Sequence, residues 1–213
     1  MGWDYYDIIE APNGERIFAV ADVCGKGSAA AMLMVMIRSV LRMLATQGLP
    51  DDQLVKALNR HMAQDLKCDL FVAVSLLFYH PQTDSFSHYR AGQEPLIRVK
   101  SDGQAQMVRE AKGMAIGMAD VDLFEKTLKP VELKLEEGEF LFVSTDGTKE
   151  AMNENHEEFG NDRLLAVLQA ARQLQADLMV QKVVESVVAF EHGAPRHDDI
   201  TLLIIKKQLA GAS

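Results

Sequence analysis

Short apolar runs of strand-like composition come in pairs along this chain, and a turn signal separates the members of each pair. Pro12, Asn13 and Gly14 lie between the runs at 5–10 and 16–21. The other turn signals lie at 81–84, 101–103 and 136–138. Strands joined by short turns pair as antiparallel hairpins, and helical patterns are grouped between these hairpins. The chain therefore predicts an α+β fold with antiparallel sheets.

Helices are expected at four places. The first covers 28–47, is followed by Gly48, and has apolar positions at roughly helical spacing that are predicted to face the core: Met32, Met36, Val40, Met43 and Ala45. A second helix starts at Asp51 or Asp52 as its cap and runs to Lys67. Two more are expected at 161–173 and 176–191. The remaining strands are expected at 71–79, 85–91, 95–100, 105–109, 124–135, 139–144 and 200–206, with a loop at 113–122.

The stretch from Ala29 to Leu44 comes closest to the length of a membrane span. A transmembrane helix needs about 18 or more predominantly apolar residues. Arg38 and Arg42 interrupt the stretch, so we interpret it as a core helix.

Four aspartates stand at the ends or the starts of strand-like runs: Asp4, Asp22, Asp146 and Asp198. Strand ends gather at the edge of a layered sheet, so these side chains can converge. Two like charges about 4 Å apart repel by roughly 4 kcal/mol at an effective dielectric constant near 20, which predicts bound cations. Oxygen ligands of this kind suit Mg²⁺ or Mn²⁺ rather than zinc.

Two details of this group depend on neighbouring residues. Asp198 and Asp199 are adjacent, and because successive side chains of an extended chain alternate, only one of them points easily into a site. We choose Asp198. Asp7, close to the first aspartate, is interpreted as a turn or surface carboxylate.

Composition limits the class of protein. The 213 residues are 48% hydrophobic, enough for one large domain, and the net charge of -9 argues against nucleic acid as the main partner. Cys24 and Cys68 form no disulfide framework or metal-ligand motif, which indicates a reduced, cytoplasmic setting. The histidines show no ligand spacing and are expected to be solvated or hydrogen-bonded: His61, His80, His88, His156, His192 and His197.

Seven motifs in order resemble those of the 2C-type metal-dependent protein serine/threonine phosphatases, in particular their bacterial SpoIIE/RsbU-like branch. Any one motif is weak, but the seven together are specific and extend from residue 2 to about 206. They are Gly2-Trp3-Asp4-Tyr5-Tyr6-Asp7, Ala21-Asp22-Val23-Cys24-Gly25-Lys26-Gly27, Ala91-Gly92-Gln93-Glu94-Pro95, residues 113–117, Thr145-Asp146-Gly147-Thr148-Lys149-Glu150-Ala151, Phe159-Gly160 and Asp198-Asp199-Ile200-Thr201.

The resemblance implies a sandwich of two antiparallel β-sheets flanked by helices. Residues 1–208 would be the phosphatase domain, excised from the C-terminal part of a longer protein, and 209–213 a tail. The implied activity is removal of phosphate from serine or threonine of a small regulatory protein in bacterial stress signalling. The implied substrate is a phosphorylated STAS-type anti-sigma-factor antagonist. Separately, the long helix that begins near Ser28 is expected to be the contact of a homodimer. The domain would be cytoplasmic, and a missing upstream segment could anchor the full-length protein to a membrane.

The resemblance also implies roles for particular residues around a binuclear Mn²⁺ or Mg²⁺ site. The nucleophile would be a metal-activated water, so no side chain attacks the phosphate. Asp22 would bridge both metals, and the carbonyl of Val23 would bind one of them. Asp146 and Asp198 would hold the other metal, and Asp4 would contact the second metal through water. Asp199 and Gly147 would lie next to these ligands and support them without binding a metal themselves.

Two positions depart from the branch pattern. Trp3 replaces the second glycine of a Gly-Gly-Asp motif, and Gln93 replaces a histidine. The bulk of Trp3 next to Asp4 supports an alternative function: a regulatory domain of the same fold, weak or inactive as an enzyme, that binds a signalling partner. A second alternative is a metal-dependent hydrolase of small phosphate esters.

Overall fold

The computed structural model describes residues 3–25, 27–66, 70–196 and 198–208. The chain forms two compact units. Unit 1 comprises Met1–Glu94 and Arg109–Lys134, and unit 2 comprises Pro95–Val108 and Leu135–Ser213. The tail predicted at 209–213 lies outside the described residues, as do Lys26, Cys68 and His197.

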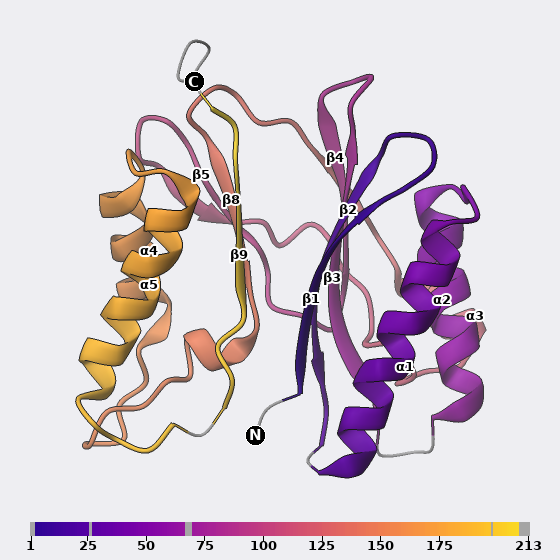
Figure 1. The fold of residues 1–213 in the computed structure, drawn as a ribbon, viewed down its shortest axis with the longest axis horizontal. Coiled ribbons are helices and arrows are strands. Elements are labelled where there is room, and N and C mark those ends of the chain that lie inside the picture. The colour runs from indigo at the N-terminus through magenta and orange to yellow at the C-terminus, as the bar shows by residue number, and fades with distance from the viewer. Residues whose placement is uncertain (1–2, 26, 67–69, 197, 209–213) are drawn as a thin grey trace. The chain divides into compact units, whose positions relative to one another are not determined.

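Unit 1 contains a five-stranded antiparallel sheet with the strand order β1-β2-β3-β4-β7. Its strands are β1 (Asp4–Glu10), β2 (Arg16–Val23), β3 (Val72–His80), β4 (Ser85–Ala91) and β7 (Val131–Leu133). The turn signals at 12–14 and 81–84 produce the β1–β2 and β3–β4 hairpins as predicted. Three helices pack on one face of this sheet: α1 (Ser28–Ala45), α2 (Asp51–Asp65) and α3 (Val121–Thr127) (Figure 1).

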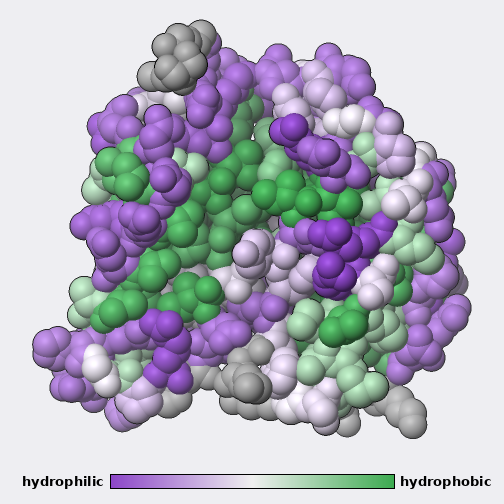
Figure 2. Space-filling model, viewed as in Figure 1, coloured by the Kyte–Doolittle hydropathy of each residue, from purple (hydrophilic) through white to green (hydrophobic). Residues whose placement is uncertain are grey.

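The buried face of α1 differs from the predicted one. Its buried residues are Ala30, Leu33, Ile37, Leu41, Leu44 and Ala45. Met32 is 73% exposed and Met43 is 44% exposed, so the assignment of these two methionines to the core was wrong. Ala45 is buried as predicted, whereas the other core positions lie one residue further along than expected, which is a rotation of about 100° on a helix with 3.6 residues per turn. Apolar side chains consequently reach the surface along α1 (Figure 2).

Among the described residues, α1 is also the helix whose length and apolar composition would allow it to cross a membrane. One third of it is buried inside the protein, and core helices of globular proteins pass the same test.

Unit 2 contains a four-stranded antiparallel sheet with the strand order β6-β5-β8-β9. Its strands are β5 (Ile97–Val99), β6 (Ala105–Met107), β8 (Phe140–Ser144) and β9 (Leu202–Lys206). Two antiparallel helices, α4 (Gly160–Ala171) and α5 (Ala176–Glu191), cover one face of it (Figure 1). Phe140, Phe142, Leu168 and Val183 fill the layer between this sheet and its helices. Both units therefore have the predicted α+β layering.

The strand predicted at 124–135 was wrong over its first half. The structure has α3 there, and only Val131–Leu133 forms a strand. The side chain of Asp120 accepts a hydrogen bond from the backbone N–H of Leu123 at 2.8 Å and so caps the helix. Phe124 on its inner face is fully buried. An N-cap of this kind stabilises a helix by about 0.5–2 kcal/mol. Together with the burial of Phe124, it favours a helix here over the strand that the composition indicated.

Candidate metal centre

Asp4 and Asp22 lie directly opposite each other in the β1–β2 ladder. Residues in such a pair project on the same face of the sheet with Cβ atoms about 4.5–5.5 Å apart. Both aspartates are partly exposed, while their neighbours Tyr5, Ala21 and Val23 are buried. Unit 1 therefore places two predicted ligands together at the end of one hairpin.

The position of Asp22 and Val23 is fixed from both sides of β2. Val23 pairs with Val72 on β3, and the ladder continues through a hydrogen bond from the N–H of Cys24 to the carbonyl of Phe71 at 3.0 Å. Immediately afterwards the chain turns into α1. Gly25 and Gly27 take positive φ angles of 111° and 85° in this turn, a backbone region that side chains with a Cβ avoid. The turn therefore connects the pair of candidate ligands directly to α1.

In unit 2, Asp146 and Asp198 come to the same end of the sheet. The ends of β8 and β9 are tied by Thr145 and Thr201, whose backbone N–H and carbonyl join at 3.0 Å. Asp146 follows Thr145 and opens a short 3-10 helix, η1 (Asp146–Thr148).

Gly147 shows how closely the two aspartate-bearing segments of unit 2 approach. A Cβ atom on residue 147 would lie 1.9 Å from the carbonyl oxygen of Asp199 and 3.5 Å from the Cβ of Asp198. A residue with a side chain could occupy this position only if one of the two segments shifted. The Asp-Gly sequence is thus required by the contact between the turn after β8 and the segment before β9.

The two adjacent aspartates of this segment have different surroundings. Asp198 is exposed, and its Oδ1 accepts a hydrogen bond from the N–H of Asp199 at 2.9 Å. The charge of Asp199 contributes to raising the pKa of Arg196, after the hydrogen bond to Glu191 that is the main cause. The selection of Asp198 as the ligand stays a prediction.

The two departures from the branch pattern both lie in unit 1. Trp3 packs against the core of that unit, and its indole Nε1 is buried with no hydrogen-bond partner among the described residues. Gln93 is only 4% exposed, and its Oε1 accepts a hydrogen bond from the N–H of Glu94 at 3.0 Å. Its carbonyl accepts another from Arg90 at 2.9 Å. Gln93 therefore has a structural role in the turn after β4.

The interpretation of Asp7 as a turn or surface residue was wrong. Asp7 lies within β1, its side chain is 11% exposed, and it forms a two-pronged ion pair with Arg42 on α1, with both N–O distances at 2.6 Å. Tyr5 donates a further hydrogen bond to it. Burial acts to raise the pKa of Asp7, but these bonds outweigh it and hold the pKa below its ordinary value. Arg42 and Asp7 thus fasten α1 to the strand that carries Asp4.

The predicted donors are suited to hard divalent cations. They are carboxylates and one backbone carbonyl, the oxygen ligands that Mg²⁺ and Mn²⁺ prefer. Carboxylates paired across a ladder repel unless a cation lies between them, so the Asp4–Asp22 pair fits such an ion.

Sequence reasoning missed one further group of metal-ligand type. Glu15, Asp51 and His80 place one ligand atom each within 4.8 Å of one another. All three belong to unit 1, but they are far apart in the sequence, so no spacing rule could reveal them.

The fold is that of the PP2C phosphatases. The SiaA PP2C domain of Pseudomonas aeruginosa superimposes with a TM-score of 0.81 at 20% identity, over 96% of this chain and 80% of that one. The PP2C domain of SpoIIE from Bacillus subtilis gives a TM-score of 0.76 at 19% identity, over 95% and 57%. The family model of stage II sporulation protein E (SpoIIE) matches residues 12–208. The chain therefore belongs to the SpoIIE family.

Curated relatives agree with this membership. Phosphoserine phosphatase RsbU of Bacillus subtilis is 27% identical over 98% of this chain and 60% of its own length. Protein IcfG of Synechocystis is 25% identical over 95% of this chain and 35% of its own length. This chain thus spans less than two thirds of either relative. PstP, a serine/threonine phosphatase that shares the fold with a TM-score of 0.65 at 12% identity over 96% of this chain and 90% of its own, was solved with two manganese ions.

Proposed function

We propose that this chain is a Mn²⁺- or Mg²⁺-dependent protein phosphatase that removes phosphate from phosphoserine or phosphothreonine. The observation that carries the proposal is the pairing of Asp4 with Asp22 at the end of the β1–β2 hairpin. Two carboxylates on one face of a ladder create a strongly negative site, which suits divalent cations. The relatives named as phosphatases support the reaction class.

The proposed roles follow the predicted ligand set. Asp22 would bridge two cations, Val23 would add its backbone carbonyl, and Asp4 would act through water. Asp146 and Asp198, which unit 2 holds at one end of its sheet, would complete the centre. Gly147 and Asp199 would keep those two aspartates in position through their close backbone contact.

The chemistry divides between the ions and the chain. When bound, a pair of divalent cations supplies Lewis acidity toward the phosphoryl oxygens and lowers the pKa of water. The chain supplies two carboxylates, Asp4 and Asp22, whose positions are fixed by a backbone ladder, and two, Asp146 and Asp198, that flank the ends of β8 and β9. No side-chain nucleophile is assigned.

The proposal is tested by phosphate release from a phosphoserine peptide. Activity should vanish in excess chelator and return with Mn²⁺ or Mg²⁺ but not with Ca²⁺. Asp22→Asn and Asp146→Asn should each prevent the return, because each removes a charged oxygen ligand. Asp122→Asn in unit 1 and Asp162→Asn in unit 2 are matched controls at exposed aspartates and should behave as wild type. Full activity in chelator would refute the metal mechanism.

The same assay separates the alternative functions. A regulatory domain without activity would release no phosphate from any substrate with either ion. A hydrolase of small esters would act on nucleotides or sugar phosphates in preference to phosphopeptides. Trp3→Gly restores the branch pattern at the position next to Asp4. A large gain in activity in that variant would indicate that Trp3 weakens the site in this chain.

We infer that the substrate is a small phosphorylated regulatory protein of the STAS anti-sigma-factor antagonist type. The relative named RsbU supports this class, and the acidic charge of -9 disfavours nucleic acid. The domain is assigned to the cytoplasm, since Cys24 is a free cysteine. Comparing a phosphorylated STAS protein with an unrelated phosphoprotein at equal concentration tests the specificity.

A homodimer through α1 is the proposed assembly. The exposed apolar side chains of α1, Met32 and Val35, border a groove of about 700 Å³ that extends to Leu66 and Leu70. Sedimentation velocity of wild type and of Met32→Lys tests this assembly. Wild type should associate and the variant should not.

A further inference from the structure

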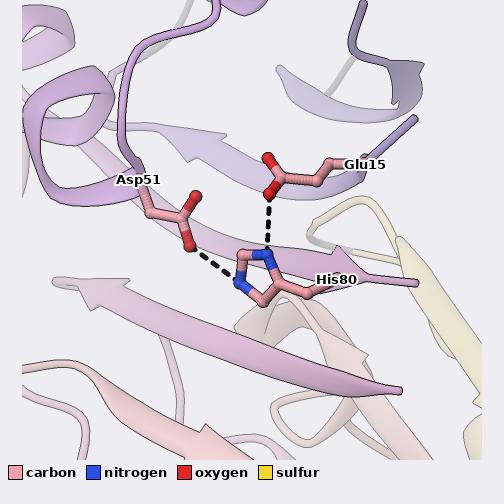
Figure 3. A group of neighbouring side chains, drawn as sticks. All are labelled: Glu15, Asp51 and His80. Atoms are coloured by element: carbon pink, nitrogen blue, oxygen red, sulfur yellow. Dashed lines mark hydrogen bonds and ion pairs between the residues drawn. The ribbon is translucent and has the colours of Figure 1, made fainter. Parts of the chain in front are cut away.

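Two carboxylates from separate segments of unit 1, those of Glu15 and Asp51, contact the imidazole ring of His80. His80 ends β3, Asp51 begins α2, and Glu15 lies in the turn between β1 and β2. The Nδ1 of His80 lies 2.9 Å from Oε1 of Glu15, and its Nε2 lies 3.1 Å from Oδ2 of Asp51 (Figure 3). The hydroxyl of Ser87 is 2.8 Å from the same Nε2. Both ring nitrogens are therefore engaged.

This group is separate from the candidate metal centre. In the β2–β3 ladder, Arg16 pairs with Tyr79 beside the group, whereas Asp22 pairs with Ala73 at the other end. Six residues of β-strand span about 20 Å at roughly 3.3 Å per residue. The Asp4–Asp22 pair and the histidine group thus occupy opposite ends of the same strands, and one cation cannot serve both.

The group carries an excess of negative charge in partly buried surroundings. The side chains of Glu15, Asp51 and His80 are 21%, 13% and 20% exposed. Glu132 on β7 pairs with Ser87 and adds a third carboxylate charge that acts on both Asp51 and His80. A protonated His80 supplies one positive charge against these three carboxylates.

The pKa shifts of Asp51 and His80 agree with this excess of negative charge. Burial is the main cause that raises the pKa of Asp51, and the charges of Glu15 and Glu132 raise it further. Burial acts to lower the pKa of His80, but Glu15, Asp51 and Glu132 outweigh it, and the net shift is upward. The charges of Glu15 and Glu132, which act to raise both pKa values, favour additional positive charge here.

We propose that Glu15, Asp51 and His80 form a site for a divalent transition-metal cation of the zinc class. One imidazole with carboxylates is a donor set that suits Zn²⁺ and similar ions rather than Ca²⁺ or Mg²⁺. Nε2 of His80 and the carboxylate of Asp51 bind the ion, which takes the place of the Nε2 proton. Glu15 accepts a hydrogen bond from Nδ1 and orients the ring, a partnership common to metal-bound histidines. Water completes the coordination.

The experiment is a titration of the chelator-treated full chain with Zn²⁺ at pH 7.5, followed by calorimetry. His80→Gln should lose one binding equivalent. Glu15→Gln should bind about 10- to 100-fold more weakly, the usual effect of removing a partner of a liganding histidine. Asp22→Asn, at the other end of the strands, should keep this equivalent, which separates the outcome from that of the proposed phosphatase centre. His61→Gln, an exposed histidine of α2, is the matched control and should bind as wild type.

A second measurement needs no variant that could misfold. In NMR spectra of wild type, Zn²⁺ should abolish the pH titration of the His80 ring while leaving His61 unchanged. If Zn²⁺ leaves the His80 titration unaltered, or if wild type and His80→Gln bind the same number of ions with equal affinity, the metal site is refuted. The group is then an ion-paired imidazolium that ties α2 to the β1–β2 turn.

Discussion

The carbonyl oxygen of Asp199 lies 1.9 Å from the point where a Cβ on residue 147 would stand. The first prediction follows from this contact. Gly147→Ala should destabilise the protein by about 1–3 kcal/mol, the usual range for overpacking a buried position. It should also weaken metal binding, because the segment carrying Asp198 must move. Urea unfolding and Mn²⁺ titration measure the two effects.

Gly160→Ala provides the matched control within unit 2. Gly160 has a positive φ of 75° but open space around its Cβ position. Its substitution should cost about 1 kcal/mol through backbone strain alone and leave metal affinity unchanged. Equal effects of the two substitutions on metal affinity would contradict the steric account of Gly147.

The second prediction concerns metal-free stability. Asp4 and Asp22 repel across the ladder, so Asp22→Asn should raise the free energy of unfolding in chelator by up to about 1 kcal/mol. In wild type, Mn²⁺ at 100 times its dissociation constant should add about 2.7 kcal/mol. Asp22→Asn should lose most of that gain. Thermal unfolding with and without Mn²⁺ measures these differences. An unfolding temperature of wild type that does not change with Mn²⁺ would contradict a formed metal site.

The third prediction concerns pH and a histidine in the unit 1 sheet. His88 is fully buried, with Nε2 2.9 Å from the hydroxyl of Ser75. Burial, helped by the charge of Arg90, lowers the pKa of His88 to about 3. Between this value and about 6.5, the unfolded chain binds the proton and the folded one does not. Stability should therefore fall as the pH falls, by about 1.4 kcal/mol from this group between pH 7.5 and pH 5.5.

Chelator-treated wild type and His88→Gln, unfolded in urea at both pH values, test this linkage. The variant should lose less stability on acidification because it removes the titrating group. His61→Gln is the control, as His61 is exposed and should retain the wild-type dependence. An identical pH dependence in wild type and His88→Gln would exclude His88 as the cause.

The fourth prediction concerns the ion pair between Arg42 and Asp7. It joins α1 to β1, and both elements connect directly to the Asp4–Asp22 pair. Arg42→Ala should therefore lower both stability and Mn²⁺ affinity. Adding Asp7→Asn should recover part of the stability, since the partly buried carboxylate is no longer left without its cation. Arg38→Ala on the same helix is the control; unchanged Mn²⁺ affinity in Arg42→Ala would reject the coupling between helix and site.

Much of the fold could be predicted because local signals agreed with tertiary structure. The turn at Pro12-Asn13-Gly14 formed its hairpin, and α1 began at the predicted residue, Ser28. The predictions that failed depended on context. Apolar residues lie on most sides of α1, so the sequence does not define which side is buried. Helix α3 forms because Asp120 caps it and Phe124 is buried, and neither effect is visible in the local composition.

The candidate site was predictable to the extent that its chemistry lies in short motifs. The motif around Asp22 placed it at a strand end, and the ladder supplied its partner, Asp4. Long-range contacts gave no such signal. Asp51 or Asp52 was expected to cap α2, yet the N-cap is Pro50, and the side chain of Asp51 contacts His80 instead. A contact such as that between Asp51 and His80 depends on how α2 packs against the sheet, and the spacing of residues along the sequence does not predict it.

Neither unit is built from one continuous stretch of chain. The chain leaves unit 1 after Glu94, returns at Arg109 and leaves again after Lys134. A fragment that stops at Glu94 would lack β7 and α3, exposing the core that Phe124 covers, and a fragment that starts at Pro95 would carry those elements with no sheet to receive them. A gene encoding either half alone therefore yields an incomplete core, and the two units can be inherited, fused or transferred only together.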